Sequence, residues 1–168
     1  MMRRLALASA LFVAVGSAAP SMAVAGTASS VIDISASVPM NCTISAYGMN
    51  FGAYSPTTGS RVTGTVKTNC TVNASAVITL SQGYYAATGT SDTAPLRRLG
   101  NADNTNHLSY TLYKDYEKTA IWGNSTSTGV TVTGNGTDKS TSVYGETPAG
   151  QTVPAGSYTD TVTATVTF

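Results

Sequence analysis

Alternation over the last thirteen residues, Gly156–Phe168, constrains the fold more than any other feature. The apolar parity holds Tyr158, Val162, Ala164, Val166 and Phe168, and threonines fill the other parity. A period of two is typical of a β-strand with one buried and one solvent-facing side. A sandwich strand of this kind needs a neighbour on its open edge. Because the alternation runs to the last residue, we expect the covering strand to come from elsewhere in the sequence or from another chain.

A second alternating segment lies near the N-terminus. Ile32, Ile34, Ala36 and Val38 occupy one parity, and Pro39 then ends the strand because proline cannot donate a ladder hydrogen bond. The residues allow two interpretations: a first strand in the chain's own sheet, or a strand donated to a groove on a neighbouring subunit. Burial of these four side chains would contribute about 5–10 kcal/mol before ordering costs.

The first 25 residues have the composition of a secretion signal. It consists of a basic start (Arg3, Arg4), an apolar stretch (Leu5–Ala19) and a small-residue cleavage motif (Ala23–Ala25). We expect cleavage after Ala25, with cleavage after Ala23 as the alternative. The apolar stretch is too short to span a membrane. Export would place the mature chain in a compartment that permits disulfides.

The mature chain, Gly26–Phe168, would have 143 residues, which suits one domain with its own core. We expect residues 26–38 to be an extension and residues 39–168 to be the domain. Without Arg3 and Arg4, seven basic residues face eight acidic ones, so the net charge is about −1. Such a chain offers no basic surface for nucleic acid and no polybasic membrane patch.

Cys42 and Cys70 are the two cysteines, 28 residues apart. In an exported chain we expect them to form a structural disulfide, which contributes roughly 3–4 kcal/mol in the chain-entropy model. A catalytic thiol would need a base, and the single histidine, His107, is distant in sequence. His107 also has no second histidine or nearby acidic cluster with which to bind a metal.

The remaining pattern predicts an all-β protein without a long helix. Short alternating runs are separated by Gly, Asn, Pro and Ser clusters. The predicted strands are Val62–Cys70, Asn73–Ser81, Leu96–Leu99, His107–Tyr113, Val130–Thr133, Thr141–Tyr144 and Ser157–Phe168. About seven short strands in such a length indicate an immunoglobulin-like β-sandwich.

Asp160 interrupts the apolar parity, and we expect it to face solvent rather than to be a paired, buried carboxylate. The aromatic residues Phe51, Tyr110, Tyr113, Trp122, Tyr144 and Tyr158 are expected in or near the core.

An ordered set of landmarks from about residue 30 to the C-terminus resembles the spore coat protein U domain, which is shared by subunits of archaic chaperone–usher pili. The landmarks are Cys42–Ile44, Asn50–Tyr54, Cys70–Thr71, Leu80–Gly83, Arg97–Leu99, Leu108–Asp115, Trp122–Gly123, Val143–Pro148, Gln151 and Gly156–Val162. No single landmark is specific, whereas their order is.

The resemblance implies an incomplete immunoglobulin-like sandwich that lacks its last strand and is completed by a donor strand. The segment matching the donor is roughly Ser30–Val38, with Ile32, Ile34, Ala36 and Val38 filling the neighbour's groove. The strand with Val162, Ala164, Val166 and Phe168 would form one edge of that groove. A periplasmic chaperone, an outer-membrane usher and identical or related pilin subunits would be the partners. The product would be an extracellular fibre on the bacterial surface, for attachment to abiotic or glycan surfaces and biofilm formation.

Two other functions stay open at this point. One is a self-contained secreted coat or matrix protein, which would fold alone. The other is a carbohydrate-binding adhesin module, in which Tyr84 and Tyr85 would contact the glycan. An enzyme is least favoured, because the sequence shows no constellation of nucleophile, base or metal ligands, and no cofactor is expected.

Overall fold

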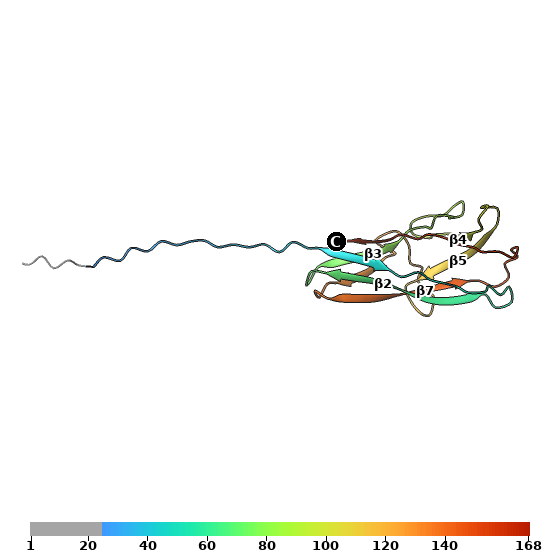
Figure 1. Ribbon diagram of the computed structural model, residues 1–168, viewed down its shortest axis with the longest axis horizontal. Helices are drawn as coiled ribbons and strands as arrows, with labels where there is room; N and C mark the ends of the chain where they lie inside the picture. Colours follow the sequence, from blue (N-terminus) through green and yellow to red (C-terminus); the bar gives the residue numbers. More distant parts are fainter. Residues whose placement is uncertain (1–24) are drawn as a thin grey trace, which may run out of the picture. The chain divides into compact units, whose positions relative to one another are not determined.

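Eight β-strands and no helix make up the regular structure of residues 25–168, the part described by this computed structural model (Figure 1). The strands are β1 (Cys42–Ala46), β2 (Ser60–Cys70), β3 (Ser75–Leu80), β4 (Arg97–Gly100), β5 (His107–Tyr113), β6 (Val130–Thr133), β7 (Asp138–Thr147) and β8 (Ala164–Thr167). Within these residues no helix is long and apolar enough to cross a membrane. The predicted secretion signal, apart from Ala25, lies outside the described residues.

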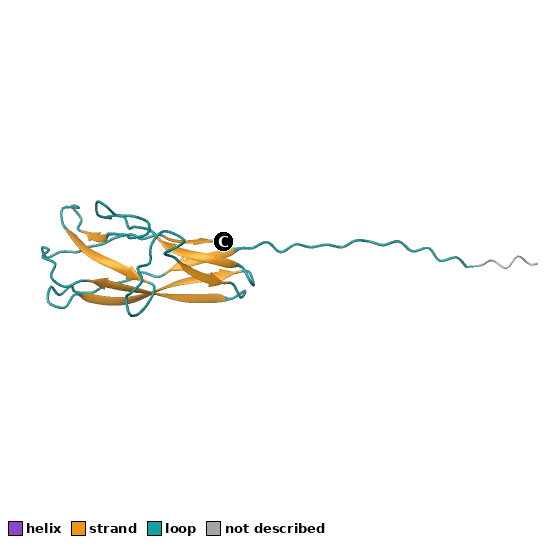
Figure 2. Cartoon of the chain, turned by 180° about the vertical axis from the view of Figure 1, so that it is seen from behind, coloured by secondary structure: helices purple, strands orange, loops and turns teal. Residues whose placement is uncertain are grey.

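The strands form two sheets that pack face to face (Figure 2). One sheet has five strands in the order β1-β2-β7-β5-β4, and the other has three in the order β6-β3-β8. Every pairing between strands is antiparallel. The all-β prediction is therefore confirmed, and the architecture is that of an immunoglobulin-like sandwich whose smaller sheet ends at β8.

Several strand predictions agree closely with the structure. β5 and β6 have the predicted bounds, and β2, β3 and β4 differ from prediction by one or two residues at their ends. β7 begins at Asp138 rather than Thr141, and β1 was not predicted as a strand. In β7 the first residues, Asp138–Ser142, are polar on both parities, so they carry no alternating signal although they pair with β2.

The core lies between the sheets and is built from the inward parity of the strands, together with Ala74 and Trp122 from the loops. Its buried members are Val66, Cys70, Ala74, Ala76, Ile78, Leu80, Tyr110, Leu112, Trp122, Val132 and Val143. Trp122 has 0% exposure and its indole nitrogen donates a hydrogen bond to the carbonyl of Ile78 at 2.9 Å. A buried indole that has found an acceptor adds apolar contact without an unsatisfied donor.

A disulfide joins Cys42 and Cys70, which stand directly opposite each other on β1 and β2. It ties the edge strand β1 to the sheet at the point where the chain enters the sandwich. β1 has a single neighbour in its sheet, so hydrogen bonds hold it on one side only. The disulfide adds a covalent link to these bonds.

We expect the double variant Cys42→Ala/Cys70→Ala to lose about 3 kcal/mol of unfolding free energy, because the unfolded chain regains the entropy of an open loop. Urea denaturation of the mature protein measures this loss. Wild-type protein under reducing conditions is the control and should match the double variant. An unchanged urea midpoint in both would contradict the expectation.

The C-terminal segment differs from the single strand predicted over Ser157–Phe168. Only Ala164–Thr167 forms β8, while Thr159 makes an isolated bridge with Gly100 of the other sheet. The segment changes sheets between these two points, so it cannot form one continuous ladder. Phe168 follows the end of β8 and is 49% exposed, rather than fully on the buried side.

Residues 25–36 form a unit separate from Ser37–Phe168 and contain no strand. Their side chains are exposed, with Ile34 at 92%. Within the domain unit, Val38 is exposed as well, and the first strand begins only at Cys42. The alternating segment therefore adds no strand to either sheet of its own chain.

Candidate functional site

The two edge strands β1 and β8 face each other along one side of the sandwich. β1 ends the five-stranded sheet and β8 ends the three-stranded sheet. They contact each other, yet no ladder pairs them. This side of the sandwich is therefore open in both sheets, and unpaired main chain borders it.

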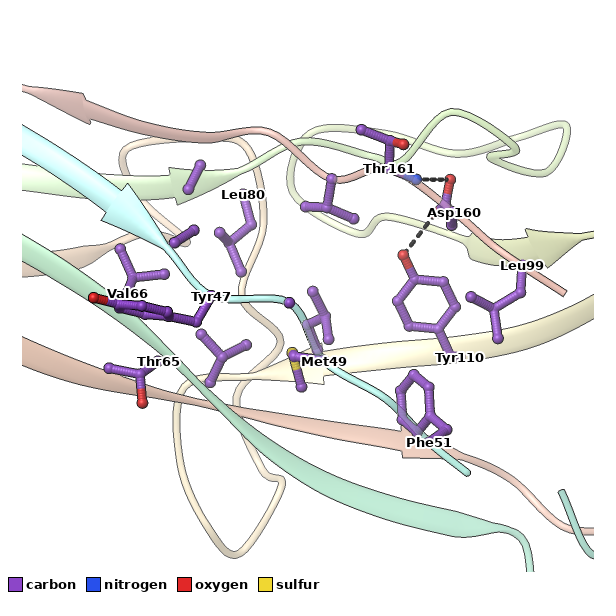
Figure 3. Close-up of a pocket in the computed structure, with 16 residues that line it drawn as sticks. Tyr47, Met49, Phe51, Thr65, Val66, Leu80, Leu99, Tyr110, Asp160 and Thr161 are labelled. Atoms are coloured by element: carbon purple, nitrogen blue, oxygen red, sulfur yellow. Dashed lines mark hydrogen bonds between the residues drawn. The ribbon is translucent and has the colours of Figure 1, made fainter. Parts of the chain in front are cut away.

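A hollow of about 330 Å³ lies inside this open side (Figure 3). We call it the open groove. It is lined by Ala46, Tyr47, Gly48, Met49, Phe51, Thr65, Val66, Leu80, Leu99, Tyr110, Leu112, Val143, Asp160, Thr161, Val162 and Ala164. Most of these side chains are apolar, and several belong to the hydrophobic core. The hollow opens to solvent although core side chains line it, so it can accommodate apolar side chains from another segment.

The backbone along the C-terminal wall of the groove has unpaired groups. The carbonyls of Thr161 and Thr163 accept hydrogen bonds from Tyr84 and Ser81, on the side of β3 and the loop after it. Main-chain groups alternate in direction along an extended strand. The N–H and C=O groups of Val162 therefore face the open side, and the same alternation applies to Ala164 and Val166 in β8.

Two glycines in neighbouring strands shape the opposite wall. A Cβ atom on Gly64 of β2 would collide with the side chain of Met49, and one on Gly145 of β7 would collide with Met49 and Phe51. The segment after β1 thus lies directly on the sheet. Sequence reasoning placed Phe51 near the core but overlooked Met49. Glycines inside strand patterns, which mark close approaches, were the available signal.

Asp160 corrects a sequence expectation, since it is half-buried and paired rather than solvent-facing. Its Oδ1 accepts hydrogen bonds from the backbone amides of Tyr84 (2.8 Å), Tyr85 (3.2 Å) and Thr161 (2.8 Å). Its Oδ2 accepts a 2.6 Å hydrogen bond from the hydroxyl of Tyr110 (Figure 3). The carboxylate turns inward because these four donors together replace water.

Arg97 is a second polar group that sequence reasoning did not assign to the interior. It is 1% exposed and stands opposite Tyr110 in the β4–β5 ladder. Its guanidinium donates to the carbonyls of Ser81 (2.8 Å), Leu80 (2.8 Å) and Trp122 (2.9 Å). Among the described residues, Nη1 has no hydrogen-bond partner. The side chain therefore ties the end of β3 to the opposite sheet.

Burial lowers the pKa of Arg97 to about 10, and the nearby Tyr110 and Asp160 oppose this shift. Arg97 consequently stays protonated at neutral pH. Burial also raises the pKa of Tyr110, and its hydrogen bond to Asp160 raises it further. The phenol is then protonated throughout the physiological range and acts as the donor to the carboxylate.

The other predicted site residues are spread over the domain. Val162, Ala164 and Val166 pack against the core from the C-terminal wall of the open groove, and Phe168 does not belong to that cluster. Tyr84 is 77% exposed and packs edge-on against the half-buried Tyr85. No group of three or more His, Cys, Asp and Glu side chains gathers as a metal site within residues 25–168.

Comparisons with known proteins agree with this geometry. The model of the spore coat protein U domain matches residues 28–165. "Protein U" of Myxococcus xanthus is 41% identical over 159 residues, covering 88% of this chain and 89% of that protein. A chain in the crystal structure of the CsuC–CsuE chaperone–tip adhesion subunit pre-assembly complex, from archaic chaperone–usher Csu pili of Acinetobacter baumannii, matches with a TM-score of 0.57 and 23% identity. That match covers 78% of this chain but 40% of the solved one, and it supports the fold. The chain belongs to the spore coat protein U domain family.

Proposed function

We propose that this protein is a structural subunit of a chaperone–usher pilus and that it polymerises by donor-strand complementation. The open groove carries this proposal, because an apolar hollow of about 330 Å³ lies between two unpaired strand edges. Such a groove offers both pockets for side chains and main-chain groups for a ladder. The occupant is the segment Ser30–Val38 of a second copy.

The donor segment fits the groove edge in length and in parity. Ser30–Val38 and the groove edge Asp160–Phe168 each have nine residues, about 30 Å when extended. The donor places Ile32, Ile34, Ala36 and Val38 at alternate positions, and the edge has Val162, Ala164, Val166 and Phe168 at the same spacing. Inserted beside β8, the donor would add a fourth strand to the smaller sheet and pack its apolar side chains into the hollow.

An incomplete sandwich also requires protection before assembly. An uncovered strand edge next to an apolar hollow is an aggregation hazard. A periplasmic chaperone would cover it after export, and an outer-membrane usher would exchange the chaperone for the next subunit's donor. The assembled fibre would be extracellular and serve surface attachment and biofilm formation.

The polymerisation test is Ile34→Asp in the mature chain. Ile34 lies in the middle of the donor, and a carboxylate there would enter an apolar pocket without a partner, at a cost of several kcal/mol. We expect wild-type protein to form oligomers in size-exclusion chromatography with light scattering, and the variant to stay monomeric.

Ser35→Asp is the matched control, because the same charge one residue later falls on the parity that faces solvent. It should assemble as wild type does. Assembly of Ile34→Asp to the wild-type extent would refute donor insertion.

A self-contained coat or matrix protein is the second candidate, favoured by the 41% identity to Protein U over nearly its whole length. Such a protein would be monomeric and stable without residues 26–38. The same chromatography distinguishes it, because wild-type protein would then elute as a folded monomer.

A further inference from the structure

The C-terminal segment crosses between the two sheets at Asp160. Thr159 exchanges both main-chain hydrogen bonds with Gly100 of β4, at 2.8 and 2.9 Å. Four residues later, the carbonyl of Thr163 accepts from Ser81, just past the end of β3. Between these anchors the segment belongs to neither ladder. Its one main-chain hydrogen bond there runs from the amide of Tyr84 to the carbonyl of Thr161, and its other side lies along the groove.

The carboxylate of Asp160 lies in a small cup of main-chain amides at this crossing. Gly83 has φ +86°, which turns the amides of Tyr84 and Tyr85 toward the same Oδ1 atom. Successive amides in such a turn form an anion-binding nest. A Cβ atom on Gly83 would collide with the carboxylate, so the close approach depends on glycine.

The same carboxylate borders two hollows. Asp160 lines the open groove and also a second hollow that continues toward Gly156 and Tyr54. Tyr110, whose hydroxyl binds Oδ2, lies on β5 of the opposite sheet. This side chain therefore adds to the main-chain bond between Tyr84 and Thr161 and also fixes the crossing segment to the floor of the groove.

We propose that Asp160, held by the nest at residues 83–85 and by Tyr110, is a positioning residue that keeps the vacant groove in its donor-ready shape. This inference rests on the proposed function. The C-terminal wall is then already ordered when the donor arrives, so donor binding does not include the cost of ordering it. In a binding equilibrium, apparent affinity falls by the fraction of molecules in the competent state. Loss of the hydrogen bonds to Asp160 therefore weakens donor binding, because fewer vacant molecules then have the competent shape.

The test uses the full mature chain with Ile34→Asp, which is expected to be monomeric and to keep its groove vacant. A fluorescent peptide of Ser30–Val38 is added, and anisotropy gives its Kd. Asp160→Asn removes the charge and turns an NH2 group toward existing donors. Gly83→Ala keeps the carboxylate in the chain but pushes it out of the nest, because the added Cβ atom would collide with it. We expect both to raise the Kd about tenfold or more, and Tyr110→Phe, which removes one hydrogen bond of four, to raise it about threefold.

Asp138→Asn is the matched control, because it makes the same change on an exposed carboxylate that is hydrogen-bonded only to Asn69. Its Kd should not change. A second readout separates positioning from general stability: Asp160→Asn should lower the Tm of the peptide complex more than that of the vacant protein, because weaker peptide binding adds to the loss. Hydrogen exchange at Thr161 should accelerate in the vacant protein only.

Each result has a distinct meaning. An unchanged Kd with equal Tm losses in vacant and filled protein would overturn the positioning role and leave the proposed function standing. No peptide binding by the Ile34→Asp host would overturn both. If Asp160→Asn does not fold, Tyr110→Phe becomes the deciding variant. An unchanged peptide Kd in Tyr110→Phe overturns the inference.

Discussion

A variant that carries its own donor strand is expected to unfold at a much higher temperature than the same domain without one. Both proteins lack Gly26–Val38, and one has Ser30–Val38 appended after Phe168 through a short flexible linker. The appended strand would fill the open groove and pair with the free edge of β8. With about 5–10 kcal/mol from apolar burial, the expected rise in Tm is roughly 20 °C or more.

The measurement is thermal unfolding by circular dichroism, with an appended strand that contains Ile34→Asp as the matched control. The control has the same length and linker but should gain little. Equal, cooperative melting of the truncated and extended proteins as monomers would mean that the groove needs no donor. In that case the self-contained coat protein becomes the better description.

Donor insertion should affect unfolding rates even more than equilibrium stability. A donor strand leaves only when many pocket contacts and ladder bonds break together, so its loss has a high barrier. A fibre built in this way persists because dissociation is slow, whatever the concentration of free subunits. Slow unfolding of the extended variant in concentrated denaturant would show the same barrier within one chain.

The sequence predicted those parts of the fold whose information is local. The alternation in His107–Tyr113 determined β5 to the residue, and the cysteine count predicted the disulfide. These features depend on neighbours in sequence or on simple counting, which a single chain displays.

Asp160 shows what a local pattern cannot supply. Its parity would place it with the apolar residues, and its charge argued for solvent instead. The deciding donors come from Tyr84 and Tyr85, 76 and 75 positions away, and from Tyr110, 50 positions away. A carboxylate becomes an interior residue only when such donors converge on it. Nothing in Gly156–Phe168 reports on them.

The pair Arg97 and Arg98 makes the same point in two adjacent residues. Both looked alike in the sequence, yet Arg97 is 1% exposed while Arg98 is half-buried on the other face of β4. Arg98 donates to the carbonyls of Tyr85 and Ala86 in a surface loop. Alternation predicts that the side chains of Arg97 and Arg98 point to opposite faces of the strand. It does not tell which face is the core, because both residues carry the same charge.

Arg97→Leu is expected to cost roughly 3–5 kcal/mol of unfolding free energy, enough to leave part of the protein unfolded at 37 °C. Leucine fills similar space, but it leaves the carbonyls of Leu80, Ser81 and Trp122 without their donor. Buried acceptors without partners cost about 1–3 kcal/mol each. Urea denaturation of the mature protein, monitored by Trp122 fluorescence, measures the loss.

Arg98→Leu is the control, because it makes the same substitution one residue away and removes two donors from loop carbonyls that water can reach. Its cost should stay below about 1.5 kcal/mol. Arg97→Lys should recover only part of the loss, since a single ammonium cannot match the fork that bonds three carbonyls, one in β3 and two in loops. Equal losses for Arg97→Leu and Arg98→Leu would show that burial of the guanidinium is incidental. A larger loss at Arg97 means that an interior charge holds the end of β3, and with it one wall of the open groove. All the acceptors of this charge are main-chain carbonyls.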